Sequence, residues 1–239
     1  CRCNGHSGKT EWHIFYRCTD ETNGSVKYYT KDYISEEMVG DIRGMWPLNA
    51  DNTSSDLEDV SVKANALTAT NITSADAVTG VRNKATDFDG STEYLSCTDA
   101  ACGGSTKLDP ASSMSFGLWV KPSSVGANDL IAGKSASYWL SIGFTADSCG
   151  GTGKFNFASA AGGTYSCANS TTTPVAGQWY FLVGTSDGTN IRLYINGQLE
   201  GTTAKGNPPD STNEFYVGGH GGDMATYGFP GVIEEPFVT

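Results

Sequence analysis

Turn signals divide the sequence into short β-prone segments, spaced about ten residues apart. Asp187-Gly188 and Asn196-Gly197 are the clearest, because a type I′ hairpin turn needs positive φ at both central positions. In residues 191–195, which lie between them, every second residue is Ile or Leu. Such alternation indicates a strand with one buried face, and strands of this kind must pack sheet on sheet. The sequence therefore predicts an all-β, two-sheet antiparallel sandwich of jelly-roll type.

Eleven segments have this character, and only residues 32–39 are weakly helical, which we interpret as a connector. We expect strands at residues 42–48, 85–88, 94–97, 114–121, 129–134, 138–144, 154–159, 178–186, 190–198, 214–218 and 229–237.

The first part of the chain differs from the rest. Residues 10–18 and 25–33 are aromatic, β-prone runs on either side of a turn-like segment, a pattern typical of a hairpin. An isolated hairpin is marginally stable in water, so we expect it to be held by a disulfide of Cys18 with Cys1 or Cys3, or by packing on another surface. We predict a cysteine-containing β-hairpin extension at residues 1–38 and a jelly-roll domain at residues 39–239.

Charge and cysteine content indicate where the protein works. A net charge of -11 disfavours nucleic acid and anionic membrane surfaces as partners, and no apolar run reaches membrane-spanning length. Seven cysteines without a C-x-x-C pair indicate disulfides, and hence an extracellular or cell-surface location. Four N-x-S/T sequons, at Asn23, Asn52, Asn71 and Asn169, agree with a secreted glycoprotein.

Six segments in co-linear order resemble one family. They are GMWPL at 44–48, ATDFDG at 85–90 followed by Tyr94 and Leu95, MSFGLWVKP at 114–122, GQWYFLV at 177–183, IRLYING at 191–197 and FPGVIEE at 229–235. Over residues 40–239 the chain resembles the laminin G-like domains of the concanavalin A-like jelly-roll superfamily. The resemblance implies a two-sheet jelly roll that recognises a glycan or an extracellular protein.

Some details of the sandwich follow from its strands and cysteines. We expect Trp119 and Trp179 to fill the gap between the sheets. The family has Asp where this chain has Glu234, and because Pro236 cannot donate to a ladder, the last strand should be an edge or be interrupted. Cys97 with Cys102 and Cys149 with Cys167 are candidate disulfides, although sequence alone leaves other pairings open. Those four cysteines flank short segments.

Motifs for catalysis are absent from the sequence. Glucan-cleaving members of the superfamily carry carboxylates in an alternating E-x-D-x-x-E pattern, which does not occur here. Glu234 and Glu235 are adjacent and would face opposite sides of a strand. G-x-S-x-G and H-E-x-x-H are also missing. We therefore predict a protein that is not an enzyme, with a glycoside hydrolase as the less favoured alternative.

Candidate binding residues follow from the chemistry of sugars and calcium. Lectin-like sites stack a sugar on an aromatic ring and hydrogen-bond its hydroxyls, and loops at the ends of a sandwich usually carry recognition. The candidate ligand residues are Tyr138, Trp139, Tyr165 and Tyr227, with His220 and Asp223 in a glycine-rich loop. Calcium accepts irregular cages of oxygen ligands, for which the resemblance suggests Asp51, Asp89 and Glu234. The alternative is an acidic surface that binds no ion.

Two classes of non-catalytic function remain open. The first is a recognition or adhesion module for a glycan or an extracellular protein. The second is a structural subunit of an extracellular filament or array with no selective ligand. An odd number of cysteines leaves one for intermolecular linkage, and a detachable hairpin can add strands to a neighbour's sheet edge. Residues 1–38 are therefore the predicted site of self-association.

Overall fold

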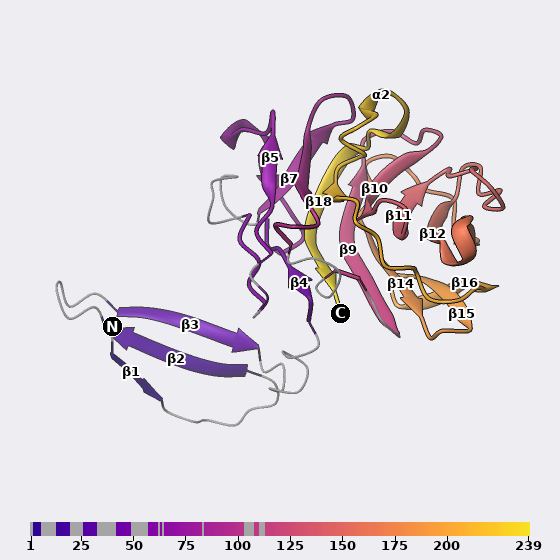
Figure 1. Cartoon of the computed structure of the whole chain (residues 1–239). Coiled ribbons are helices and arrows are strands. Elements are labelled where there is room, and N and C mark those ends of the chain that lie inside the picture. Colours follow the sequence, from indigo (N-terminus) through magenta and orange to yellow (C-terminus); the bar gives the residue numbers. More distant parts are fainter. Residues whose placement is uncertain are drawn as a thin grey trace. The chain divides into compact units, whose positions relative to one another are not determined.

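Figure 1 shows a computed structural model of the chain, which forms two compact units, Cys1–Asp41 and Ile42–Thr239. The residues described are 2–5, 13–19, 26–32, 42–48, 57–61, 63, 65–82, 84–102, 108–109 and 113–239. Predictions for Cys1, Asn23, Asp51 and Asn52 lie outside these residues. That residues 1–38 and 39–239 are separate domains stays a prediction.

The first unit is an antiparallel sheet in the order β1-β2-β3. The predicted hairpin corresponds to β2 and β3, and a third strand, β1, pairs with β2, which the sequence did not indicate. Cys3 lies opposite Cys18 in the β1–β2 register. The disulfide of Cys18 with Cys1 or Cys3 stays a prediction, because the side chains of this unit lie outside the description. The strands are β1 (Arg2–Gly5), β2 (His13–Thr19) and β3 (Val26–Asp32).

The second unit contains two antiparallel sheets, which confirms the predicted sandwich (Figure 1). The first sheet has seven strands, in the order β13 (Ser166–Asn169), β12 (Phe155–Ser159), β11 (Tyr138–Ile142), β10 (Asp129–Lys134), β17 (Phe215–Val217), β8 (Tyr94–Cys97) and β5 (Thr68–Thr70). The second has eight, in the order β16 (Gln198–Ala204), β15 (Asn190–Ile195), β14 (Tyr180–Ser186), β9 (Met114–Pro122), β18 (Pro230–Val238), β7 (Lys84–Asp89) and β6 (Ala77–Thr79), with β4 (Gly44–Met45) also pairing with β18.

Helical segments are short. They are η1 (Ser74–Asp76), η3 (Ala161–Gly163) and α2 (Met224–Tyr227). None of the described helices has the length and hydropathy needed to cross a bilayer.

The core lies between the two sheets and follows the two-residue period of the strands. Ile191, Leu193 and Ile195 are buried, as the alternation in β15 predicts. On the facing sheet, Phe157 packs so closely that a Cβ atom on Gly184 would lie 2.2 Å from its ring. The Phe157 ring therefore occupies the space that a side chain at Gly184 would need.

The prediction that Trp119 and Trp179 fill the core is wrong. Phe116, Leu118 and Val120 of β9 are fully buried, so Trp119 points to the opposite face, where it is partly exposed. Trp179 is also partly exposed. The core tryptophan is instead Trp46, which is fully buried, stacks on Phe215 at 5.1 Å between ring centroids and donates from Nε1 to the Asn65 carbonyl.

Two disulfides fasten loops of this unit. Cys97 is bonded to Cys102 at the end of β8, and Cys149 is bonded to Cys167 of β13. Both bonds lie within the seven-stranded sheet or the loops next to it. They restrict the unfolded chain, and each closes only a short loop.

The buried carboxylate of Glu234 organises the turn between β6 and β7. Its two oxygens accept hydrogen bonds from the backbone N–H groups of Val81 (2.5 Å) and Arg82 (2.9 Å). The register of β18 with β9 shifts between Glu234 and Phe237, which is the interruption expected near Pro236. However, β18 is an internal strand, which lies between β9 and β7. The alternative of an edge strand is therefore wrong.

We expect Glu234→Gln to lower the free energy of unfolding by about 2 kcal/mol, because an amide nitrogen, which cannot accept, replaces one of the two carboxylate oxygens that bind backbone N–H groups. The matched control is Glu235→Gln, whose carboxylate pairs with Arg82, a side chain that is 59% exposed. Exposed ion pairs contribute about 1 kcal/mol or less. Denaturant titration of both variants checks this, and equal losses would contradict the role given to Glu234.

Candidate functional site

Aromatic side chains gather on the outer face of the seven-stranded sheet. Trp139 of β11 and Tyr216 of β17 lie on either side of β10, and both are opposite Gly133 in register. Because Gly133 has no side chain, the two rings face one another across it, with centroids 6.4 Å apart and planes 9° apart. A Cβ atom there would lie 2.8 Å from the Trp139 ring, so only glycine permits this arrangement.

A glycine-rich loop after β17 places His220 on these rings. The imidazole centroid lies 4.9 Å from that of Tyr216 and 6.1 Å from those of Trp139 and Tyr227. His220 Nε2 is 3.3 Å from Ser135 Oγ, while Nδ1 is buried with no hydrogen-bond partner among the described residues. Among the described residues, the imidazole thus has one polar atom whose hydrogen-bonding capacity is unused.

We call this cluster the aromatic site, and its members are Tyr94, Trp139, Tyr165, Tyr216, His220 and Tyr227. Trp139 and Tyr216 are 2% and 7% exposed and form its floor. The other four members are partly exposed and surround that floor. Partly exposed rings over a packed base are well suited to receive a flat, weakly polar ligand.

Two phenol groups of the aromatic site stay protonated over the whole physiological range. Burial raises the pKa of Tyr165, which hydrogen bonds from the Trp139 side chain and the Ala136 backbone only partly oppose. Burial also raises the pKa of Tyr216, and its hydrogen bond with Glu214 acts in the same direction. Both hydroxyls are therefore neutral groups that can donate as well as accept.

The structure brings together four of the six predicted ligand residues, namely Trp139, Tyr165, His220 and Tyr227. Asp223 is exposed and caps α2 by accepting from Thr226 N. Tyr138 must be corrected, because its side chain is fully buried and donates its hydroxyl to the Leu108 carbonyl within the core. Adjacent strand residues face opposite sides, so Tyr138 and Trp139 cannot share one surface.

Sequence reasoning missed Tyr94 and Tyr216. Each alternates with core residues, such as Leu95 in β8 and Phe215 in β17, so their outward direction was readable from the pattern. Their membership of the site depends on the pairing of β17 with β10 and β8, which joins distant segments. No local signal in the sequence specifies that pairing.

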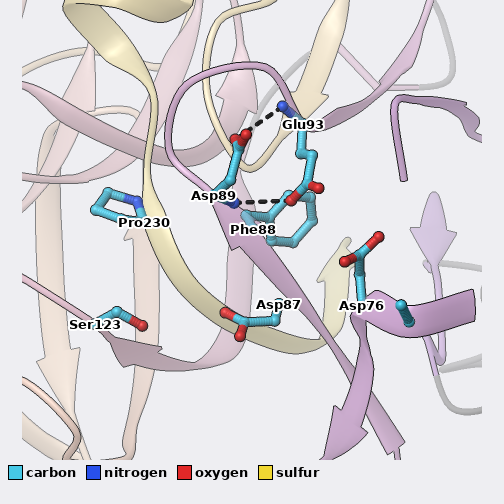
Figure 2. Close-up of a pocket in the computed structure, with 8 residues that line it drawn as sticks. Asp76, Asp87, Phe88, Asp89, Glu93, Ser123 and Pro230 are labelled. Carbon is cyan, nitrogen blue, oxygen red and sulfur yellow. Dashed lines mark hydrogen bonds between the residues drawn. The ribbon is translucent and has the colours of Figure 1, made fainter. Parts of the chain in front are cut away.

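A second feature is an acidic pocket with a cavity of about 360 Å³ at the edge of the eight-stranded sheet (Figure 2). Its carboxylates come from η1, from β7 and from the turn that leads to β8, and Ser123 and Pro230 complete it. The residues that line it are Ala75, Asp76, Asp87, Phe88, Asp89, Glu93, Ser123 and Pro230.

The carboxylates of the pocket differ in their hydrogen bonds and in the direction of their pKa shifts. Asp89 accepts from three backbone N–H groups and two hydroxyls of residues 91–93, and these bonds outweigh its burial and lower its pKa well below the usual range. Figure 2 shows that the Glu93 carboxylate in turn accepts a hydrogen bond from the backbone N–H of Asp89. Burial raises the pKa of Asp87 and of Glu93, and nearby Asp76 adds to both shifts.

The predicted calcium ligands are not brought together. Asp89 pairs with Pro230 in register, and Glu234 lies four residues further along β18, about 13 Å away at the usual rise per residue. The carboxylates of both bind backbone N–H groups, and Asp51 lies outside the described residues. Within the described part of the chain, no group of three or more His, Cys, Asp and Glu is arranged to hold a metal ion. Calcium binding stays a prediction without a located site.

Two predicted glycosylation sites can be placed. Asn71 is exposed and its Nδ2 donates to the Thr92 carbonyl. Asn169 is half-buried, its Nδ2 donates to the Cys149 carbonyl and its Oδ1 accepts from Asn156. A glycan on Asn169 would have to fit beside these contacts, so Asn71 is the more accessible of the two.

A comparison with protein-family models agrees with this architecture. Residues 89–238 match the family model Laminin_G_3, described as the concanavalin A-like lectin/glucanases superfamily. The chain belongs to this family. A search of curated proteins gave no significant match for the laminin G-like domain.

Solved structures share the fold of this laminin G-like domain. Domain 4 of AbnA, a GH43 extracellular arabinanase from Geobacillus stearothermophilus, solved with arabinotriose, is 21% identical, with a TM-score of 0.61 over 82% of this chain and 91% of that one. Botulinum neurotoxin type C, whose cell entry depends on two ganglioside molecules, is 13% identical, with a TM-score of 0.56 over 84% of this chain. The binding domain of botulinum neurotoxin DC, solved with rat synaptotagmin II, is 12% identical, with a TM-score of 0.54 over 84% of this chain. The chain spans 48% of each toxin structure.

We expect Asp87→Asn to raise the thermal midpoint at pH 7. The pKa of Asp87 is raised chiefly by burial, so the charged form opposes folding once the pH exceeds the folded-state value. The gain should vanish as the pH falls below about 4, where the carboxyl is protonated in both states. Melting curves between pH 7 and pH 3 measure this.

Asp187→Asn is the control of opposite sign. The N–H of Asn190 and the guanidinium of Arg192 lower the pKa of Asp187 to about 2, so its charge favours folding above about pH 4. This variant should melt lower at pH 7. A loss of stability in Asp87→Asn at pH 7 would contradict the burial penalty.

Proposed function

We propose that this laminin G-like domain is a non-catalytic extracellular module that binds carbohydrate through the aromatic site. The observation that carries the proposal is the gathering of partly exposed rings around His220 Nδ1, a polar atom with no hydrogen-bond partner among the described residues. Sugar rings present flat C–H faces to aromatic rings and hydroxyls to polar groups, and this site offers both.

The structural neighbours support a binding role. One neighbour is a domain of an extracellular arabinanase with arabinotriose bound, and others are toxin structures linked to gangliosides and to synaptotagmin. The arabinanase domain is matched over most of its length, whereas the toxins are matched over about half. Short neutral oligosaccharides are therefore the first ligand class to test, with sialylated glycans and an extracellular protein after them.

The acidic pocket is less suited to bind carbohydrate than the aromatic site. Its four carboxylates would repel acidic sugars, and its one aromatic ring, Phe88, is 2% exposed. The aromatic site has neutral phenols and partly exposed rings instead. The disulfides Cys97–Cys102 and Cys149–Cys167 agree with an oxidising, extracellular setting.

We expect Tyr165→Ala and Tyr227→Ala each to weaken oligosaccharide binding at least about tenfold, equivalent to about 1.4 kcal/mol. Each removes a partly exposed ring of the aromatic site. The matched control is Tyr194→Ala, which removes a partly exposed ring from the eight-stranded sheet. A glycan array followed by calorimetry with the best ligand makes the measurement. Equal weakening in all three variants, or no selective binding by the wild type, contradicts the proposal.

Self-association through residues 1–38 is a second proposal, favoured by the three-stranded sheet of the first unit. Its outer strands, β1 and β3, are the edges to which a neighbour's strand can add. We expect the full chain to form oligomers whose fraction rises with concentration and falls on reduction of intermolecular disulfides. Light scattering after size exclusion, with and without reductant, measures both effects. A protein that stays monomeric in both conditions contradicts the proposal.

A further inference from the structure

Lys134 is a lysine whose side chain points into the sandwich. It ends β10 and lies opposite Tyr138 of β11 and Phe215 of β17, which are both buried in the core. Residues directly opposite in a sheet share a face, and the side chain of Lys134 is only 2% exposed. A lysine in such a place needs a specific partner, because a buried ammonium without one is strongly unfavourable.

Two carboxylates contact the Lys134 amine. Nζ donates to Oδ2 of Asp109, whose side chain is 2% exposed, and to Oδ1 of Asp99 at 2.8 Å, whose side chain is 18% exposed. Asp99 belongs to the loop closed by the Cys97–Cys102 disulfide, and Asp109 lies before β9. A nucleophile, a carboxyl carbon and a second carboxylate are thus held in one buried cluster.

The Asp109 carboxyl is fixed on its other side as well. Its Oδ1 accepts from the backbone N–H of Ser211 at 3.1 Å. Arg43 Nη1 donates to the backbone carbonyl of Asp109 at 3.3 Å. Burial raises the pKa of Asp109, and the nearby Lys134 only partly opposes this shift. The protonated form of the carboxyl group is therefore easier to populate than in water. An N–H donor on one oxygen and an amine on the other are what acyl substitution at this carbon requires.

We propose that Lys134 and Asp109 condense to form an intramolecular isopeptide bond, with Asp99 transferring the proton. A proton first passes from the Lys134 ammonium to Oδ2 of Asp109, which leaves a neutral amine beside a carboxylic acid. Nζ then bonds to Cγ of Asp109 while Asp99 accepts a second proton from the nitrogen. The Cγ–Oδ2 bond breaks, and Oδ2, which already carries one proton, leaves as water with the proton that Asp99 returns. Ser211 N–H stabilises the negative charge that forms on Oδ1. One ammonium and one carboxylate give one amide and one water, without oxidation or reduction.

The fold supplies what the same reaction lacks in water. Groups held in contact react as if at effective concentrations of about 10⁵ to 10⁸ M. Condensation also removes two buried charges, which are unfavourable to desolvate. The bond would join β10 of the seven-stranded sheet to the segment that leads into β9 of the eight-stranded sheet.

The decisive experiment is intact-mass spectrometry of the full chain, produced without glycosylation, reduced and denatured. We expect the wild type to be one water lighter than its sequence mass. A tryptic digest should lack cleavage after Lys134 and contain a branched peptide that joins Lys134 to Asp109. The matched variant Lys134→Arg keeps the cation but cannot condense, so it should have the full sequence mass.

Asp99→Asn tests the proton transfer separately. It leaves Lys134 and Asp109 in place, so a folded variant should keep the full sequence mass. A wild type of full mass that trypsin cleaves after Lys134 overturns the proposal. So does a water loss that persists in Lys134→Arg, because that loss would come from another residue. A lighter Asp99→Asn protein would overturn the role of Asp99. The wild-type branched peptide decides the question even if Lys134→Arg does not fold.

Discussion

The packing of two sheets face to face is the constraint on which the rest of this laminin G-like domain depends. Each strand gives every second side chain to the shared core, so the residues between them must face outward. In β11 this rule buries Tyr138 and turns Trp139 to the surface. Core packing therefore places Trp139 on the outer face, and residues of the loops, such as His220, complete the aromatic site around it.

The fold could be predicted from the sequence where the local pattern was strong. The limits of β8 and β10 coincide with the expected segments, and the core positions of β15 follow its alternation. The short strands β5, β6 and β13 were not expected, because three or four polar or small residues carry no period. Trp119 was assigned to the core from its size alone, although its neighbours in β9 already occupied the inner face.

The candidate site was less predictable than the fold. Trp139, Tyr165, His220 and Tyr227 were chosen as aromatic or loop residues, but that they meet follows from sheet order. Tyr216 completes the floor only because β17 inserts between β10 and β8. The Lys134 cluster shows the same limit, because Asp109 and Ser211 reach it from segments that are distant in sequence. Patterns along the chain give the direction of a side chain, and sheet pairing gives its neighbours.

The internal position of β18 affects the order in which the chain can fold during synthesis. This strand pairs with β9 and β7, and its far end also holds β4. Until residues 230–238 have left the ribosome, β9 and β7 have no strand between them, and the turn held by Glu234 has no anchor. The sandwich therefore cannot close progressively from its first residues. The pairing of β9 and β7 with their shared neighbour therefore has to wait until β18 has been made, and long-range pairing of this kind slows folding.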